Sequence, residues 1–290
     1  MNKFVYTGLI VLFSACAGQT EKKEAVAADS TEVSKSIPEM QAGDVIAGIN
    51  LTVSEGKRLI SKGIAHHPKV KEKLKKGMVI ITSGTTNTYI AEELAGLDAP
   101  HGSLMTGNVI PQGREDIAKG LTRVSNITLI DGVKVDIDFE EALKNMQPDD
   151  IVFKGANLLN YEKKQAAVCI GSPTGGTTAH IRSTENAYLI VPVGLEKETF
   201  GDLLEYEKLF SGNAVQSSQI PRLWVHTGAE IFTEIEAIKT IASVNVAPFA
   251  SGGIAGREGG ISLAVYGKKE EVQKVLDFVA SIQGEPSFVD

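Results

Sequence analysis

Two hydrophobic patterns alternate along most of this chain. Short runs of apolar or β-branched residues, typical of buried parallel strands, precede stretches in which apolar positions recur with helical spacing. The clearest strand pattern is residues 78–82, which read MVIIT, and a helical pattern follows at residues 86–96. The alternation predicts an α/β protein with a mostly parallel, Rossmann-like sheet and helices on both of its faces.

The turn residues between these patterns predict further elements. Asp131-Gly132 divides residues 126–138 into a β-hairpin, because this dipeptide favours the tight turn that hairpins need. Residues 149–160 and 165–181 each begin with a buried strand that runs into a polar loop. The other expected helices are residues 53–77, 139–146, 230–243 and 269–283, and the other expected strands are residues 187–194, 222–228, 245–251 and 261–267. The strand–helix–strand–strand–helix order after residue 220 predicts a small split-βαβ, ferredoxin-like unit.

The first residues have the pattern of a secretory signal. Lys3 gives a positive start, an apolar stretch follows as far as residue 13, and residues 14–16 (SAC) resemble a bacterial lipobox. The apolar stretch is too short to span a bilayer. Cleavage before Cys16 would leave it as the lipid-bearing first residue, anchored in a membrane by its acyl chains. An ordinary secretory signal with a cysteine near its end is the alternative.

These features divide the chain into four segments. Residues 1–15 are the expected signal peptide, and residues 16–48, rich in Ala, Glu, Lys and Ser, are the expected disordered tether. Residues 49–220 are the expected ligand-binding α/β domain, and residues 221–290 the small C-terminal unit. The expected location is the bacterial cell envelope, lipid-anchored in the periplasm or at the outer membrane.

Composition narrows the choice of partners. The 290-residue chain is 42% apolar and carries a formal net charge of −7, so it can bury a sizeable core but lacks a concentrated basic surface. Nucleic acid is therefore not an expected partner. The lysine-rich residues 69–77 are expected to be a solvated helix face. Of the two cysteines, Cys16 is assigned to the lipid and Cys169, within an apolar strand pattern, is expected to be a buried, inert thiol.

Three strands end in loops of unusual content, residues 83–87, 154–160 and 171–178. Ligands of open parallel sheets bind at the carboxyl ends of the strands, where helix N-termini and glycine-rich backbone favour anions. A helix cap needs only one Ser, Thr, Asn or Asp, so the repetition favours a small phosphate, carboxylate or CoA-type ligand over capping alone. The expected ligand-binding residues are Ser83, Gly84, Thr85, Thr86, Asn87, Gly155, Asn157, Ser172, Thr174, Gly175, Gly176 and Thr177.

Two charged residues are the catalytic candidates. Lys154 ends a buried strand and could clamp an anion or stabilise an enolate-type charge, although its stem could equally cover the sheet edge with a solvated tip. Glu196 follows another strand beside Lys197, where it could act as an acid/base or form a surface ion pair. The histidines show no metal-binding spacing, and neither a P-loop nor a dinucleotide fingerprint is present, so no metal or cofactor is expected.

The segment GMVIITSGTTNTYIAEEL resembles the strand, Gly/Thr loop and helix that open ribose-5-phosphate isomerase A and its relatives. DDIVFKGANLLN is similar to the segment with a GAD-like sequence in sugar isomerases and CoA-transferase-like domains. The resemblance covers roughly residues 55–200 and implies a Rossmann-like sheet with its pocket at the three loops. The acidic residue that the family pattern has after GA is Asn157 in this chain.

The sequence thus leaves two functions open. The first is a membrane-tethered protein that binds a small anionic metabolite and carries out isomerase- or transferase-like chemistry. The second is a non-catalytic envelope lipoprotein that acts as a binding or interaction module. A homo-oligomer is compatible with either function.

Overall fold

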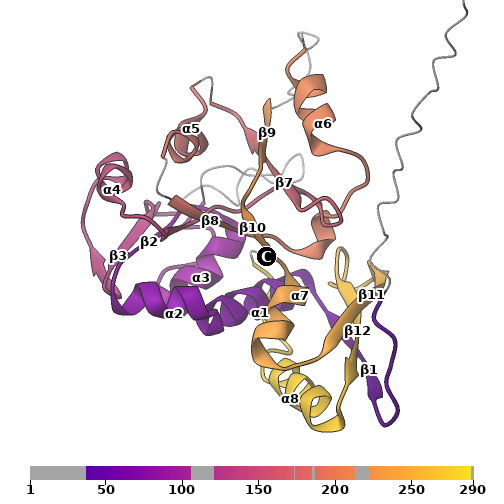
Figure 1. Cartoon of the computed structure of the whole chain (residues 1–290). Coiled ribbons are helices and arrows are strands. Elements are labelled where there is room, and N and C mark those ends of the chain that lie inside the picture. Colours follow the sequence, from indigo (N-terminus) through magenta and orange to yellow (C-terminus); the bar gives the residue numbers. More distant parts are fainter. Residues whose placement is uncertain (1–36, 106–120, 173, 185–186, 213–221, 289–290) are drawn as a thin grey trace, which may run out of the picture. The chain divides into compact units, whose positions relative to one another are not determined.

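A six-stranded mixed sheet forms the centre of the fold in this computed structural model, which describes residues 37–105, 121–172, 174–184, 187–212 and 222–288 (Figure 1). Its strand order is β10-β8-β5-β2-β3-β4. The first four strands in that order run parallel, and β3 and β4 continue the sheet as an antiparallel hairpin. The strands are β2 (Met78–Ile81), β3 (Ile127–Ile130), β4 (Val133–Val135), β5 (Asp150–Phe153), β8 (Ala187–Pro192) and β10 (Glu230–Phe232).

The hairpin confirms the turn predicted from the sequence. Asp131 and Gly132 have φ values of 49° and 77°, the left-handed conformation that both central residues of such a turn must adopt. Glycine adopts it without steric cost, and aspartate is among the few other residues that tolerate it.

Helices pack on both faces of this sheet. Val79, Ile81 and Phe153 point to the face covered by α1 (Val53–His66), α3 (Thr85–Ala95) and α7 (Glu234–Ile241). Ile80 and Val152 point to the opposite face, where they pack against α4 (Phe139–Asn145) and α5 (Gly176–Arg182). Figure 1 shows α4 and α5 on one side of the sheet and α1 and α3 on the other. The central strands β2 and β5 are buried on both faces, which is why they read as continuous apolar runs.

Two three-stranded antiparallel sheets complete the fold. The first has the order β1-β12-β11, and α8 packs against it. The second has the order β6-β7-β9, with α6 packed against β7 and β9. The elements are β1 (Val45–Leu51), β6 (Leu158–Asn160), β7 (Gln165–Ile170), α6 (Leu203–Phe210), β9 (Arg222–His226), β11 (Asn245–Ser251), β12 (Ile261–Gly267) and α8 (Lys269–Ala280).

The strand pairings do not follow the expected division at residue 220. The chain separates into Met1–Ile37 and a compact unit, Pro38–Asp290. Within that unit β9 pairs with β7 and β10 pairs with β8, while β1 pairs with β12. The strand that begins the expected C-terminal unit, β9, therefore lies in a different sheet, and an N-terminal strand takes a place beside β12.

Four local expectations are wrong. The helix expected at residues 53–77 is two helices, because α2 (Pro68–Lys75) begins at a proline, whose ring cannot continue α1. Residues 230–232 are strand β10 rather than the start of a helix, and β7 lies in an antiparallel sheet rather than the parallel one. Cys169 is exposed rather than buried. The lysine-rich segment does form the expected solvated helix face, with Lys71 and Lys75 exposed.

Candidate functional site

The carboxyl ends of the parallel strands meet along one edge of the six-stranded sheet. Just beyond each strand, backbone hydrogen bonds still join neighbouring segments: Thr82 N–H to Phe153 O at 3.2 Å, Lys154 N–H to Ile190 O at 3.2 Å, and Val193 N–H to Phe232 O at 3.0 Å. The loop of residues 83–87, Lys154, Gly194 and the start of α7 are consequently held in one row. This is the edge at which open parallel sheets bind ligands.

The loop of residues 83–87 uses two of its polar side chains to hold itself in place. Asn87 Nδ2 donates hydrogen bonds to Thr82 O at 2.7 Å and to Phe153 O at 3.2 Å. The Ser83 amide and hydroxyl both donate to Asn126 Oδ1. The N-cap of α3 is Gly84, which makes no side-chain cap hydrogen bond. The hydroxyl groups therefore do not cap α3, and the first amides of the helix, at Thr85 and Thr86, have no side-chain partner in the described chain.

Lys154 is buried at the end of β5. Its residue is 9% exposed, and its ammonium group makes no hydrogen bond or ion pair with any residue the structure describes. Burial lowers its pKa, because a charged amine is poorly solvated there. Val152 packs on the α4 and α5 face, so the alternation along the strand directs Lys154 to that same face. The solvated-tip alternative is therefore not what the structure has.

His226, on β9, lies close to Lys154. Burial, together with the nearby charges of Lys154 and Arg182, lowers its pKa to about 4. Its Nε2 is buried and has no hydrogen-bond partner among the residues that the structure describes. Near neutral pH the imidazole is therefore uncharged. Within the described parts of the chain, the buried Lys154 ammonium group and the buried His226 Nε2 both lack the polar partners that such groups normally have.

The loop that precedes α5 packs against β9, the strand that carries His226. A Cβ at Gly175 would lie 2.5 Å from the indole ring of Trp224, so the glycine packs directly on β9 with φ of 88°. The guanidinium of Arg182 lies 5.1 Å from the centre of the same ring. The N-cap Gly175 makes no side-chain hydrogen bond, and Ser172 and Thr174 bond to each other through their hydroxyls at 2.9 Å. Gly176 and Thr177 begin α5.

Asn157 lies outside this group. Its Oδ1 accepts a hydrogen bond from the backbone N–H of Cys169 at 2.9 Å, and its backbone N–H donates to Ala167 O at 2.8 Å. It therefore joins β6 to β7 rather than facing Lys154. Gly155 lies between the two, at the end of β5, where a Cβ would be 4.0 Å from Pro192 O and would meet no clash.

Glu196 belongs to a second set of charged residues, which we call the Glu234 cluster: Lys57, Glu196, Lys197 and Glu234. The Leu195 amide donates to Glu234 Oε2 at 3.0 Å, Lys197 Nζ donates to Ala156 O at 2.9 Å, and the Glu196 and Lys197 charges are 3.9 Å apart. Lys57 belongs to α1 and Glu234 to α7, the helices of the face opposite α5. The cluster and Lys154 are thus on opposite sides of the strand ends.

The Glu234 cluster holds unusual protonation states. Burial and the neighbouring Glu196 raise the pKa of Glu234 to about 8. Burial and the neighbouring Lys197 lower the pKa of Lys57 to about 8, against the opposing effect of Glu196 and Glu234. Sequence reasoning missed both residues. The available signal for Lys57 was its helical spacing with the apolar Ile60 and Ile64, which places a lysine on the buried face of α1.

Other features bear on the class of site. Among the residues that the structure describes, no group of three or more His, Cys, Asp or Glu is placed to hold a metal ion. The helices in the described ranges are all too short or too polar to cross a membrane. Residue 16 and the expected signal peptide lie outside the described residues. Comparisons with protein-family models, curated proteins and solved structures returned no match.

Proposed function

We propose that this protein binds a small anionic metabolite at the carboxyl edge of its parallel strands, with Lys154 as the principal anion-binding group. The observation that carries the proposal is the Lys154 ammonium group itself, which is buried and unpaired within the described chain. An isolated buried charge is costly, and an anionic ligand would supply the missing counter-charge.

The surroundings of Lys154 fit a phosphate, carboxylate or CoA-type group. The unpartnered Nε2 of His226 can donate one hydrogen bond to such a group in the tautomer that carries its proton there. Arg182 adds a positive charge within electrostatic reach of His226. The amides that begin α3, and the positive end of its dipole, follow the neighbouring strand β2.

A catalytic role would extend this binding. The sequence resemblance to ribose-5-phosphate isomerase A and CoA-transferase-like proteins makes an isomerase- or transferase-like reaction the first candidate. Lys154 would stabilise developing negative charge. Glu196, the other catalytic candidate, lies in the Glu234 cluster on the opposite side of the strand ends and would not act on the same ligand. The structural role of Asn157 favours the second candidate, a non-catalytic binding module, because the position where the family pattern has an acid is occupied here by an amide that joins two strands.

The protein would act at a membrane surface of the bacterial envelope. The proposal rests on the signal-like pattern that ends at Cys16 and on the length of chain between it and the fold. The first strand, β1, begins at Val45, so about 28 residues lie between the proposed lipid and the sheet that it joins.

The test is thermal unfolding of the full chain with sugar phosphates, nucleotides, acyl-CoA species and small dicarboxylates, compared with Lys154→Met. A ligand at about 100 times its dissociation constant stabilises the native state by roughly 2.7 kcal/mol, enough to detect as a shift in Tm. We expect at least one anion to raise the Tm of the wild-type protein but not of Lys154→Met. Lys71→Met, which removes an exposed lysine on α2, is the matched control and should respond like wild type. An equal shift in Lys154→Met would exclude Lys154 as the anion-binding group.

A further inference from the structure

Lys57 is a buried amine with an uncommon environment. The residue is 8% exposed, and its Nζ makes no hydrogen bond or ion pair with the residues described. It nevertheless lies within the electrostatic reach of the other three members of the Glu234 cluster, one cation and two carboxyls. Gly56, beside it on α1, leaves room for Glu234, because a Cβ at that position would come within 2.8 Å of Glu234 Oε1.

We propose that Lys57 is a nucleophilic amine that forms an imine with a small aldehyde or ketone bearing a carboxylate, with Glu234 as the proton donor. This site is distinct from the anion site at Lys154, which lies on the other face of the sheet. The Lys57 amine is buried and makes no hydrogen bond with the residues described, and the Glu234 carboxyl is held by the Leu195 amide. Lys197, which donates to Ala156 O, is the cation that would face the carboxylate of the ligand.

The electrostatics support a reactive amine. A lysine becomes nucleophilic when desolvation or a neighbouring cation lowers its pKa, and both effects act on Lys57. Its pKa of about 8 leaves a substantial neutral fraction near neutral pH, whereas an ordinary lysine is almost wholly protonated there. The pKa of Glu234, also about 8, keeps this carboxyl protonated over the same range, so that it can donate.

The reaction balances without any further reagent. The neutral Lys57 nitrogen attacks the carbonyl carbon, a C–N bond forms as the C=O π bond breaks, and one of the two amine protons passes to the oxygen, which becomes a hydroxyl. Glu234 then protonates that hydroxyl, the C–O bond breaks, and water leaves as the nitrogen lone pair forms the C=N bond. The nitrogen gives up its remaining proton, which returns to the Glu234 carboxylate. The net change is one amine and one carbonyl giving one imine and one water.

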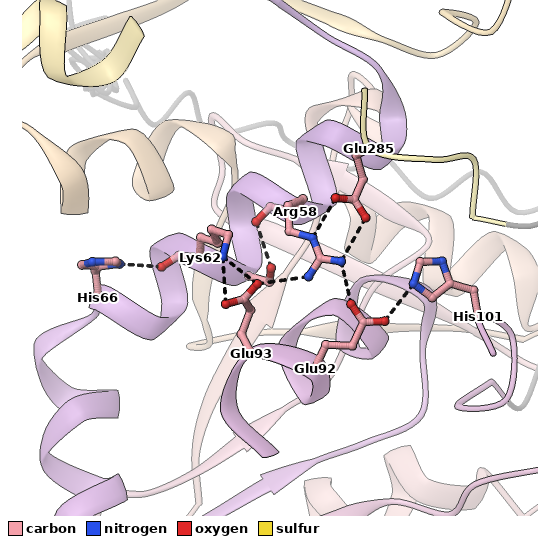
Figure 2. A network of polar contacts seen from close by, with 8 residues as sticks. Arg58, Lys62, His66, Glu92, Glu93, His101 and Glu285 are labelled. Atoms are coloured by element: carbon pink, nitrogen blue, oxygen red, sulfur yellow. Dashed lines mark hydrogen bonds and ion pairs between the residues drawn. The ribbon is translucent and has the colours of Figure 1, made fainter. Parts of the chain in front are cut away.

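The C-terminal segment covers Lys57 and would have to move to admit a ligand. The Phe288 ring lies 5.4 Å from Lys57 Nζ and stacks on His101 with ring centres 5.0 Å apart. Two further residues tie this segment to α1. The Gly284 amide donates to Glu55, and Glu285 accepts two hydrogen bonds from Arg58, at 2.9 and 3.0 Å. Figure 2 shows Glu285 and Glu92 converging on Arg58, with His101 on the far side of Glu92.

The experiment is trapping of the imine in the full chain. Glyoxylate, a small aldehyde with a carboxylate, is added with cyanoborohydride, which reduces an imine to a stable amine, and the modified lysines are located by peptide mass spectrometry. We expect Lys57 to be modified roughly tenfold or more faster than the exposed Lys71, because a larger fraction of its amine is neutral. Phe288→Ala should raise the rate at Lys57 and leave Lys71 unchanged. Glu234→Gln should lower it.

The outcomes separate this proposal from the anion site. Lys154→Met should bind no anion but trap glyoxylate normally at Lys57. Lys57→Met should still bind the anion but should lose the fast-reacting lysine. The proposal is overturned if Lys57 is modified no faster than Lys71 in both the wild-type protein and Phe288→Ala, since covering by Phe288 could not then explain the result.

Discussion

The backbone amide of Leu195 donates a hydrogen bond of 3.0 Å to Glu234 Oε2 and so joins the end of β8 to the first turn of α7. The two residues follow neighbouring parallel strands, β8 and β10, which end at the same edge of the sheet. The bond holds a carboxyl group in a buried position, and burial is the main reason that its pKa is about 8. This relationship makes the stability of the fold depend on pH in a defined way.

Glu234→Gln should flatten the dependence of stability on pH between about 4.5 and 8. In the folded state the carboxyl has a pKa of about 8, against an ordinary value of 4.5, so the folded protein binds the proton more tightly. Its stabilising effect is complete below pH 4.5 and is lost as the pH rises to about 8. The loss in wild type is of the order of a few kcal/mol. Urea unfolding at several pH values measures it; identical slopes for wild type and variant would contradict the assignment.

Lys57→Met should act in a different pH window. The amine has a pKa of about 8 in the folded protein and 10.5 ordinarily, so between these values the unfolded chain holds more protons. Wild-type stability should therefore gain about 3 kcal/mol from this residue as the pH rises from 8 to 10.5, and the variant should lack that gain. The same urea titrations, extended to alkaline pH, check this. A gain retained in Lys57→Met would place its origin elsewhere.

Arg58→Met should destabilise the protein by about 2–4 kcal/mol, because it leaves three carboxylates facing one another without their shared cation. Arg58 pairs with Glu92 at 2.6 Å, Glu93 at 3.1 Å and Glu285 at 2.9 Å, and its side chain is 14% exposed (Figure 2). Lys62→Met, which removes a more exposed partner of Glu93, is the control and should cost less than about 1 kcal/mol. Adding Glu285→Gln to Arg58→Met should restore part of the loss; no recovery would argue against like-charge repulsion as its cause.

Gly63→Ala should destabilise the protein even though alanine favours helices by about 1 kcal/mol. A Cβ at Gly63 would lie 2.6 Å from Ala237 Cα, so α1 and α7 could not keep their present separation. Gly84→Ala is the contrast: its φ is 166° and the nearest atom to a Cβ would be 3.8 Å away. Thermal unfolding should show a clear loss for the first variant and little for the second. Equal Tm values would show that the helices can separate cheaply.

Cys16→Ser should abolish incorporation of radiolabelled palmitate when the full chain is expressed in a bacterium with lipoprotein processing. The prediction rests on the lipobox-like residues 14–16, because acylation needs the cysteine thiol and amine. Cys169→Ser is the matched control and should still be labelled. Secretion of wild type without label would favour an ordinary signal peptide.

Local patterns of the sequence were sufficient for much of the fold. Residues 78–82 and 187–194 read as buried strands because both faces of β2 and β8 are covered, and Asp131-Gly132 marked the hairpin. Which strands pair with each other could not be predicted from these local patterns. The apolar run of β7 gives no sign of whether its neighbours are parallel or antiparallel, since that depends on β9, which follows much later in the chain.

The candidate site shows the same division. The place of Lys154 at the edge of the sheet could be predicted because it ends a buried strand and is followed by glycine. Glu234 could not, because its raised pKa depends on burial and on Glu196, 38 positions earlier in the chain. Nothing in the sequence around His226 marks it as a site residue, since only the tertiary fold brings its imidazole within electrostatic reach of Lys154. Contacts between residues far apart in the chain, rather than neighbouring residue types, set the environments of Glu234 and His226.

The most direct test of the central claim is an amide NMR titration of the full chain, labelled at threonine, with inorganic phosphate. Bound anion should shift the amide resonances of Thr85 and Thr86, which begin α3 after β2, the strand next to β5, and it should do so in Lys71→Met but not in Lys154→Met. That result would place the anion at the carboxyl edge of the parallel strands. Unmoved Thr85 and Thr86 resonances, or equal shifts in Lys154→Met, would contradict an anion site built on Lys154.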